Sequence, residues 1–293
     1  MSNQSGKQTV PPVPPVPSLP NLGGRFSIYS PKKFGRFEVV ETLGKGAFGS
    51  VYQVRDNTGN KFVLKVSNAD CAKYLALEFH VGRSILNPCI VPALELFEDG
   101  EFTCLLFEYI PGQTLSEYMK THQSMRVKKL LVQQLILAIA HLHTVCKIVH
   151  LDLKPDNILV VNCNGTPMIK IIDFGLACPF QLLAPGATGT LHYMAPEVAM
   201  GCEFDEKADI WSLGKIIAWI VTNQNVFLKG NHHVHTQRMH VANIFSPPIP
   251  EQMNSDPEMA WALQLCQACL AIDPNARASA MDLVKMCASL KLD

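Results

Sequence analysis

The spacing of apolar residues changes abruptly partway along this 293-residue chain. From Phe37 onward, three runs rich in β-branched residues (FEVVETL, VYQVRD and KFVLKV) are separated by a glycine-rich turn and by NTGN, which is typical of an antiparallel meander. Beyond Thr114, apolar residues recur at helical spacing, as in VKKLLVQQLILAIAHLHTV. The sequence therefore predicts an α+β chain with a small β-rich N-lobe and a larger α-helical C-lobe.

The boundaries of these two lobes follow from the same pattern. Residues 71–86 predict one main helix within the β-rich part, and FTCLLFEYI predicts a strand after it. We therefore place the N-lobe at about residues 37–107, a hinge at 108–113 and the C-lobe at 114–290.

The bulk composition argues against several classes of protein. Lys+Arg and Asp+Glu both number 25, so no net positive field favours nucleic acid. No uncharged apolar run reaches the roughly 20 residues that span a bilayer, and MSNQSGKQTV lacks the apolar core of a signal peptide. The close cysteine pair, Cys266 and Cys269, lies in the apolar helical pattern WALQLCQACL, where buried thiols are expected rather than zinc ligands or disulfides. We predict an intracellular protein, cytoplasmic or nuclear, with no membrane span.

Residues 1–31 differ in composition from the rest of the chain. They are rich in Pro, Ser and Gly and contain PPVPPVPSLP, a segment that cannot bury enough apolar surface to fold alone. We predict a flexible extension before a folded domain at 32–290. The polyproline stretch could dock an SH3 or WW domain, but no arginine lies directly beside its core, so a plain linker is the simpler interpretation.

Three glycines, Gly44, Gly46 and Gly49, separate the first two predicted strands. Glycine lets the backbone approach phosphate oxygens and offers N–H donors without obstruction by a Cβ. A dinucleotide-binding motif of this spacing would open a helix, whereas a strand pattern follows here. The segment therefore favours a nucleotide-binding hairpin over a dinucleotide-binding fold.

A lysine and a glutamate follow in positions that suit an ion pair. Lys65 is flanked by apolar residues on the third predicted strand, so its ammonium is expected to point into a cleft. Glu78 is the one acid within the predicted helix at 71–86, which makes it the natural partner of Lys65.

The decisive motifs come later and in a fixed order. His150-Leu-Asp-Leu-Lys-Pro-Asp-Asn157 is followed by Asp173-Phe-Gly175 and Ala195-Pro-Glu197, then by DIWSLG and DPNARAS. With the glycine-rich segment, Lys65 and Glu78, the set resembles the eukaryotic-type protein kinases over about residues 37–290. The resemblance implies the bilobal protein kinase fold, protein substrates, and ATP with Mg²⁺ (or Mn²⁺) as cofactors.

The resemblance also implies catalytic roles. Asp152 would accept or orient the proton of the attacking hydroxyl, and Lys154 would steady the transferred phosphoryl group. Lys65 would clamp the α- and β-phosphates while Glu78 holds it. Lys154 and Thr190 match serine/threonine-type kinases, so we predict a serine/threonine protein kinase.

The cofactors would be held by further positions that match the family pattern. Asn157 and Asp173 would supply the oxygen ligands that Mg²⁺ prefers. The residues expected around ATP are Leu43, Gly44, Gly46, Gly49, Val51, Val63, Lys65, Glu108, Ile110 and Leu159. The residue after the target hydroxyl is expected in an apolar pocket lined by Ala187, Leu191 and Met194.

One departure concerns activation. His-Leu-Asp stands where the family usually has His-Arg-Asp, so Leu151 replaces an arginine that normally binds an activation-segment phosphate. Within the activation segment, from Asp173 to Glu197, Gly186 occupies the position that is usually phosphorylated. The residues of this segment that carry a hydroxyl are Thr188, Thr190 and Tyr193. We hypothesise that activity does not require phosphorylation of this segment.

A second departure lies on the helix that carries Glu78. Gly82 occupies a position where the family usually has a bulky apolar residue, so we expect a packing gap and a helix weakened by roughly 1 kcal/mol relative to alanine. A mobile helix could require an activating partner to seat Glu78. A one-residue shift of the alignment, placing Val81 or Arg83 at this position, is the alternative.

Two other functions are alternatives to an active protein kinase. A nucleotide-binding pseudokinase, acting as a scaffold or allosteric partner, is suggested by Leu151 and Gly82. However, pseudokinases typically lose at least one catalytic group, and all of them are present here. A small-molecule kinase would not be expected to keep the Ala-Pro-Glu motif with a threonine five residues before its alanine.

Overall fold

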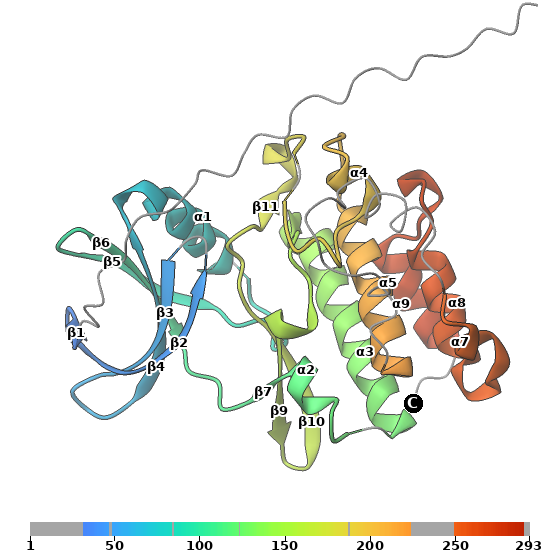
Figure 1. Ribbon diagram of the computed structural model, residues 1–293, viewed down its shortest axis with the longest axis horizontal. Coiled ribbons are helices and arrows are strands. Elements are labelled where there is room, and N and C mark those ends of the chain that lie inside the picture. Colours follow the sequence, from blue (N-terminus) through green and yellow to red (C-terminus); the bar gives the residue numbers. More distant parts are fainter. Residues whose placement is uncertain are drawn as a thin grey trace, which may run out of the picture.

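The chain forms two lobes that lie side by side (Figure 1). The computed structural model describes residues 32–46, 49–83, 85–122, 124–186, 188–223 and 249–289. The predicted Pro-rich extension at 1–31 and Ala187 lie outside the described residues.

The small lobe is built on a six-stranded antiparallel sheet with the order β1-β2-β3-β4-β6-β5. Alternate residues of its strands face a core; Tyr52 and Val54, then Leu64 and Val66, are buried there, as expected for a sheet with one buried face. The strands are β1 (Lys33–Phe34), β2 (Phe37–Gly46), β3 (Gly49–Arg55), β4 (Lys61–Asn68), β5 (Ala93–Asp99) and β6 (Phe102–Glu108).

The predicted meander is confirmed, but the sequence pattern did not reveal β5. Its sequence, ALELFED, contains the good helix formers Ala, Leu and Glu. In the fold it pairs along its length with β6, because tertiary pairing outweighs these weak local preferences. The predicted helix is α1 (Ala72–Arg83), preceded by the single turn η1 (Ala69–Cys71).

The large lobe is organised around one buried helix, α5 (Lys207–Thr222). Nearly all of its residues are buried, which fits a helix that is apolar on every side. Helix α8 packs against α5, and α3 packs against both α5 and α9. The other helices are α2 (Leu115–Tyr118), α3 (Met125–His141) with the turn η2 (Leu142–Cys146), α4 (Pro196–Ala199), α7 (Glu251–Ser255), α8 (Ala260–Cys269) and α9 (Ala280–Ser289), with single turns η3 (Pro155–Asn157), η4 (Phe180–Leu182), η6 (Pro257–Met259) and η7 (Pro274–Ala276).

One segment of the large lobe is long and apolar enough to cross a membrane by length and composition alone. It is Met125–Cys146, 22 residues with a mean hydropathy of 1.4. More than half of its most apolar window is buried within the lobe, which is the ordinary behaviour of a core helix.

Short strands line the boundary between the lobes. Strand β9 (Ile158–Cys163) pairs with β10 (Thr166–Ile171) and with β7 (Gln113–Thr114), and β8 (Ile148–Val149) pairs with β11 (Cys178–Pro179). The end of β10 is joined to the loop before β5, because Ile171 N–H donates to Cys89 O at 2.7 Å. The lobes are therefore connected by backbone pairing as well as by the chain between β6 and β7.

Candidate active site

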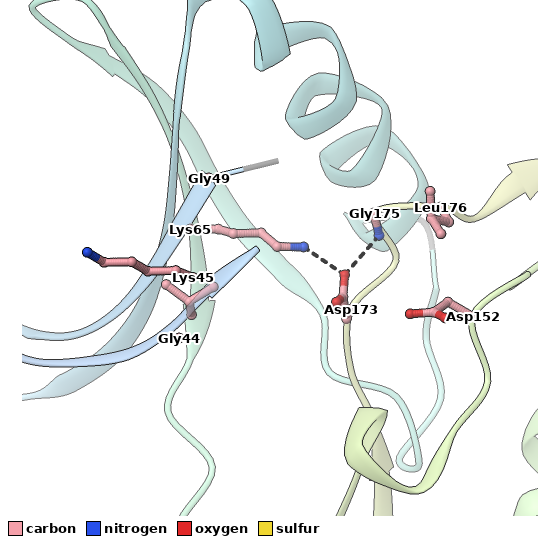
Figure 2. Close-up of a pocket in the computed structure, with 9 residues that line it drawn as sticks. Gly44, Lys45, Gly49, Lys65, Asp152, Asp173, Gly175 and Leu176 are labelled. Atoms are coloured by element: carbon pink, nitrogen blue, oxygen red, sulfur yellow. Dashed lines mark hydrogen bonds and ion pairs between the residues drawn. The ribbon is translucent and has the colours of Figure 1, made fainter. Parts of the chain in front are cut away.

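A cavity of about 230 Å³ lies between the two lobes. Figure 2 shows Lys65 and Asp152 facing it from opposite sides, with Asp173 between them, while the ammonium of Lys45 points away. The small lobe contributes the hairpin of β2 and β3, and the large lobe contributes two loops. The lining residues are Gly44, Lys45, Gly49, Val51, Lys65, Asp152, Asp173, Gly175 and Leu176.

The predicted site residues fall into two groups around this cavity. Gly44, Gly49 and Lys65, which are expected near the phosphates, line it, and so does Val51, which is expected against adenine. The other residues expected around adenine lie on β2, β4, the end of β6 with the chain that follows it, and β9, and they are outside the lining of this cavity. They are Leu43, Val63, Glu108, Ile110 and Leu159; Asn157 is also outside it.

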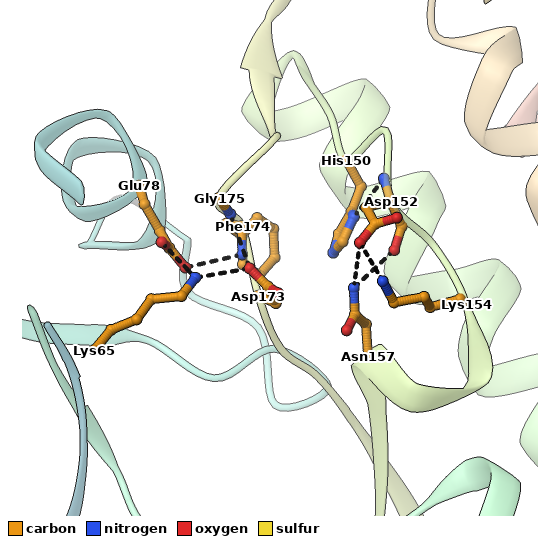
Figure 3. A network of polar contacts seen from close by, with 9 residues as sticks. All are labelled: Lys65, Glu78, His150, Asp152, Lys154, Asn157, Asp173, Phe174 and Gly175. Carbon is orange, nitrogen blue, oxygen red and sulfur yellow. Dashed lines mark hydrogen bonds and ion pairs between the residues drawn. The ribbon is translucent and has the colours of Figure 1, made fainter. Parts of the chain in front are cut away.

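Lys65 is bound by two carboxylates from different lobes. Its Nζ donates to both Oε atoms of Glu78 on α1 and to Oδ1 of Asp173, each at 2.8 Å (Figure 3). The Glu78 side chain is 1% exposed and also accepts a bond from Phe174 N–H at 3.1 Å. The predicted Lys65–Glu78 pair is thus present and connects the small lobe to the Asp173 loop.

The protonation of this cluster follows from its charges. Burial alone would disfavour the ammonium of Lys65, but Glu78 and Asp173 raise its pKa to about 12. Burial likewise opposes ionisation of Asp173, yet Lys65 and the Gly175 N–H hold the pKa of that carboxyl below its usual value. Lys65 therefore stays cationic and Asp173 anionic at neutral pH.

Asp152 is the acceptor at the centre of a second cluster. Its Oδ1 accepts bonds from Thr190 N–H at 2.8 Å and Thr190 Oγ1–H at 2.6 Å. Its Oδ2 accepts from Lys154 Nζ at 2.7 Å and Asn157 Nδ2 at 3.0 Å. The side chain of Lys154 also donates to Thr190 Oγ1 at 2.8 Å, so the structure brings together all four predicted residues of this group.

Asp209 binds the backbone of the catalytic loop, the segment from His150 to Asn157. No role was predicted for it from the sequence. It lies in the first turn of α5, is fully buried, and accepts bonds from His150 N–H at 2.7 Å and Leu151 N–H at 2.9 Å. Leu151 has a φ of 65°, a left-handed conformation that costs about 1 kcal/mol or more for a non-glycine residue. The buried carboxylate of Asp209 stabilises this strained turn. The position of Asp209 in the DIWSLG motif was the sequence feature that could have indicated this role.

Two glycines are required by close contacts with the backbone. A Cβ on Gly49, whose φ is 142°, would lie 2.0 Å from Val66 O, and one on Gly189, whose φ is 98°, would lie 2.3 Å from Leu151 O. Gly189 therefore allows the segment before Thr190 to pack directly on the catalytic loop.

The expected gap beside Gly82 is wrong. A Cβ at this position would lie 3.0 Å from the Cβ of Ala93, the first residue of β5. Gly82 thus permits α1 to pack closely on the sheet, while Val81 and Phe174 are buried in the core beside it. A bulky residue would not fit here without moving α1, so the small side chain is a packing requirement.

The donor set suits a divalent cation. Asn157 uses its amide nitrogen toward Asp152, and in Figure 3 its amide oxygen points away from Asp152 on the side of Asp173. Asp173 uses Oδ1 for Lys65 and Gly175, and its side chain remains 42% exposed toward the cavity. Hard oxygen atoms of this kind are the ligands that Mg²⁺ prefers.

The comparisons with known proteins agree with this geometry. The protein kinase domain family matches residues 37–287. The chain belongs to the protein kinase family. Mitogen-activated protein kinase kinase 2 of Arabidopsis thaliana is 31% identical over 267 residues, which cover 85% of this chain and 70% of that protein. Serine/threonine-protein kinase PrkC of Bacillus subtilis is 29% identical over 240 residues, covering 75% of this chain and 36% of that protein.

Membership of this family confirms the predicted function class. The chain is an ATP-dependent protein serine/threonine kinase with the bilobal α+β fold. As in the family at large, it uses ATP with a divalent metal and acts on protein substrates.

The activation segment of this kinase is ordered by contacts within the protein. Cys178 pairs with Val149 between β11 and β8, and Phe180 N–H donates to Lys147 O at 2.9 Å. At its far end, Glu197 and Arg277 form a buried ion pair with two bonds of 2.7 and 3.1 Å.

Proposed function

We propose that this kinase transfers the γ-phosphoryl group of ATP to serine or threonine hydroxyls through Asp152, without needing a phosphate on its activation segment. The observation that carries the proposal is the assembled pair of clusters. Lys65 is bound to Glu78 and Asp173, and Asp152 is bound to Lys154 and Thr190, all in the unmodified chain.

The chemistry asks for positioning and charge neutralisation more than for covalent catalysis. Lys65, fixed by Glu78, would bind the α- and β-phosphates. The carboxylate of Asp152 would orient the substrate hydroxyl and accept its proton. Lys154, 2.7 Å from Asp152, would place its positive charge beside the transferred group.

Asn157 and Asp173 would hold Mg²⁺ (Mn²⁺ is the alternative) through their side-chain oxygens. When bound, the ion supplies positive charge that neutralises the phosphates. Asp173 would then bind both the cation and Lys65, so this carboxylate of the large lobe would stay joined to the small lobe through Lys65.

The structure supports independence from phosphorylation in a specific way. Leu151 stands where an arginine would meet the phosphate, and its side chain packs against the large-lobe core. Phe174 is buried against the His150 ring, with 4.9 Å between centroids. Backbone pairing and apolar contacts thus order the activation segment, as a charge-assisted contact with a phosphate does in kinases that have an arginine at this position.

Phosphatase treatment is therefore expected to leave the activity of the purified kinase within about twofold of its starting value, since the contacts that order the activation segment involve no phosphate. The activity of the Thr188→Ala variant should stay within the same range, because no phosphate at this position is required. Label transfer to a peptide before and after treatment measures both. A loss of most activity on dephosphorylation, reproduced by Thr188→Ala, would contradict the proposal.

The function itself is tested by transfer of labelled γ-phosphate to peptides that differ only in carrying serine, threonine or tyrosine. We expect label on serine or threonine, none on tyrosine, and none when the divalent cation is removed by a chelator. A pseudokinase would bind nucleotide, seen as a rise in Tm, and transfer no label to any peptide.

Three sequence-based expectations stay predictions alongside this proposal: an intracellular location, an SH3 or WW partner for the proline-rich stretch, and an activating partner at α1.

A further inference from the structure

The segment Thr190–Met194 forms a tight turn against the start of α5. The N–H groups of Tyr193 and Met194 both donate to Thr190 O, at 2.9 and 3.1 Å. Two side chains of α5 reach the outer carbonyls of this turn. Ser212 Oγ donates to Tyr193 O at 2.7 Å, and Lys215 Nζ donates to His192 O at 2.8 Å.

Lys215 is an unusual residue for its place. It lies on the central helix of the lobe with only 3% of its surface exposed, and its ammonium is 5.5 Å from the ring centroid of Trp211. Burial lowers the pKa of Lys215 to about 8. An apolar residue would avoid this desolvation, and the hydrogen bond from Lys215 to the turn offsets part of its cost.

The same turn reaches both the reacting group and the substrate. Its first residue, Thr190, is bound to Asp152, while Leu191 is 38% exposed and Met194 is buried. A movement of the turn would therefore displace the peptide-facing side chains relative to Asp152.

We infer that Lys215 and Ser212 are positioning residues that fix the Thr190–Met194 turn as the surface on which the substrate residue after the target hydroxyl is read. This inference rests on the proposed function, since it assigns that surface to a protein substrate. Neither residue touches the reacting atoms; both act through backbone carbonyls.

The chain offers a matched control in Lys128. This lysine of α3 is also buried, has its pKa lowered by burial, and donates to a carbonyl of α5, Val221 O at 2.7 Å. Its contact lies at the C-terminal end of α5, whereas the turn contacts Ser212 and Lys215 in the middle of the helix. Lys128→Met removes a comparable buried ammonium without touching Thr190–Met194.

The test compares Lys215→Met, Ser212→Ala and Lys128→Met in the full chain. Amide hydrogen exchange should rise at Tyr193 and Met194 in the first two variants and stay at the wild-type rate in Lys128→Met. With peptides varied after the target hydroxyl, Lys215→Met should raise the peptide KM about 10-fold, as loss of a charged hydrogen bond would, and flatten the preference at that position. The KM for ATP should stay within about twofold. Ser212→Ala removes only a hydroxyl oxygen, so it provides a second test of the inference if Lys215→Met fails to fold.

Unchanged exchange and unchanged peptide selectivity in Lys215→Met and Ser212→Ala, or equal changes in Lys128→Met, would overturn the inference. If the wild type labels no peptide, the proposed function fails, whereas the exchange rates still decide whether these two side chains fix the turn.

Discussion

Replacing Asp152 by asparagine is expected to lower kcat by about 10²- to 10⁴-fold, the usual contribution of a positioned general base. Asparagine keeps the shape of the side chain and one acceptor oxygen, but it cannot take the proton of the substrate hydroxyl. Nucleotide affinity should change by no more than about twofold, because Lys65 and Asp173 bind independently of it. Steady-state label transfer and a nucleotide titration measure the two effects.

Thr190→Val separates the chemical role of Asp152 from its place in the hydrogen-bond network. The valine removes the hydroxyl that donates to Asp152 at 2.6 Å and accepts from Lys154, but it keeps the N–H bond. We expect a loss of about 10- to 100-fold in kcat, the worth of a hydrogen bond to a charged group. If Asp152→Asn costs no more than Thr190→Val, Asp152 orients the loop and is not the base.

Removing the buried arginine of the large lobe should have the largest effect on stability. The guanidinium of Arg277 is fully buried, binds Glu197 at 2.7 and 3.1 Å, and also donates to Lys207 O at 2.7 Å. Arg277→Met leaves the Glu197 carboxylate without its counter-ion, which should reduce the free energy of unfolding by about 3–5 kcal/mol. Urea unfolding, followed by the midpoint and slope of the transition, measures the loss.

Two variants sharpen that result. Adding Glu197→Gln to Arg277→Met removes the orphaned charge and should recover part of the stability. Arg55→Met breaks a pair with Glu38 in which both side chains are about half exposed or more, and it should cost at most about 1 kcal/mol. An equal cost for the buried and the exposed arginine would contradict the prediction, because it would show that the buried ion pair of Arg277 contributes no more than an exposed one.

Two buried charged residues of the large lobe, Arg277 and Asp209, join distant parts of the chain to the reaction centre. Arg277 fixes the end of the activation segment and Asp209 fixes the catalytic loop, each from the core of the large lobe. The cleft therefore depends on buried charges that no substrate contacts. Loss of such a residue should reduce activity and stability together, whereas Asp152→Asn should spare stability.

Much of the site could be predicted from sequence because its chemistry is carried by residue types in a fixed order. The expected partner of Lys65 was Glu78, and the fold places the two side chains 2.8 Å apart. Asp152, Lys154 and Thr190 were each expected at the site, and the fold joins Lys154 and Thr190 to Asp152 at 2.7 and 2.6 Å. Local spacing also predicted the β2–β4 meander and the helices at α1 and α3, since an apolar period is a property of the segment itself.

The tertiary structure decided what depends on neighbours far along the chain. Strand β5 exists because β6 pairs with it, against the helical preference of its residues. Gly82 is small because Ala93 lies against it, and Leu151 adopts a left-handed backbone because Asp209, 58 residues away, binds its N–H. Amino-acid order by itself determined which charges this kinase has and the sequence in which they appear. Only folding determined which charges are buried together, because the desolvation of a charge and its compensation by a partner depend on distances that no local pattern contains.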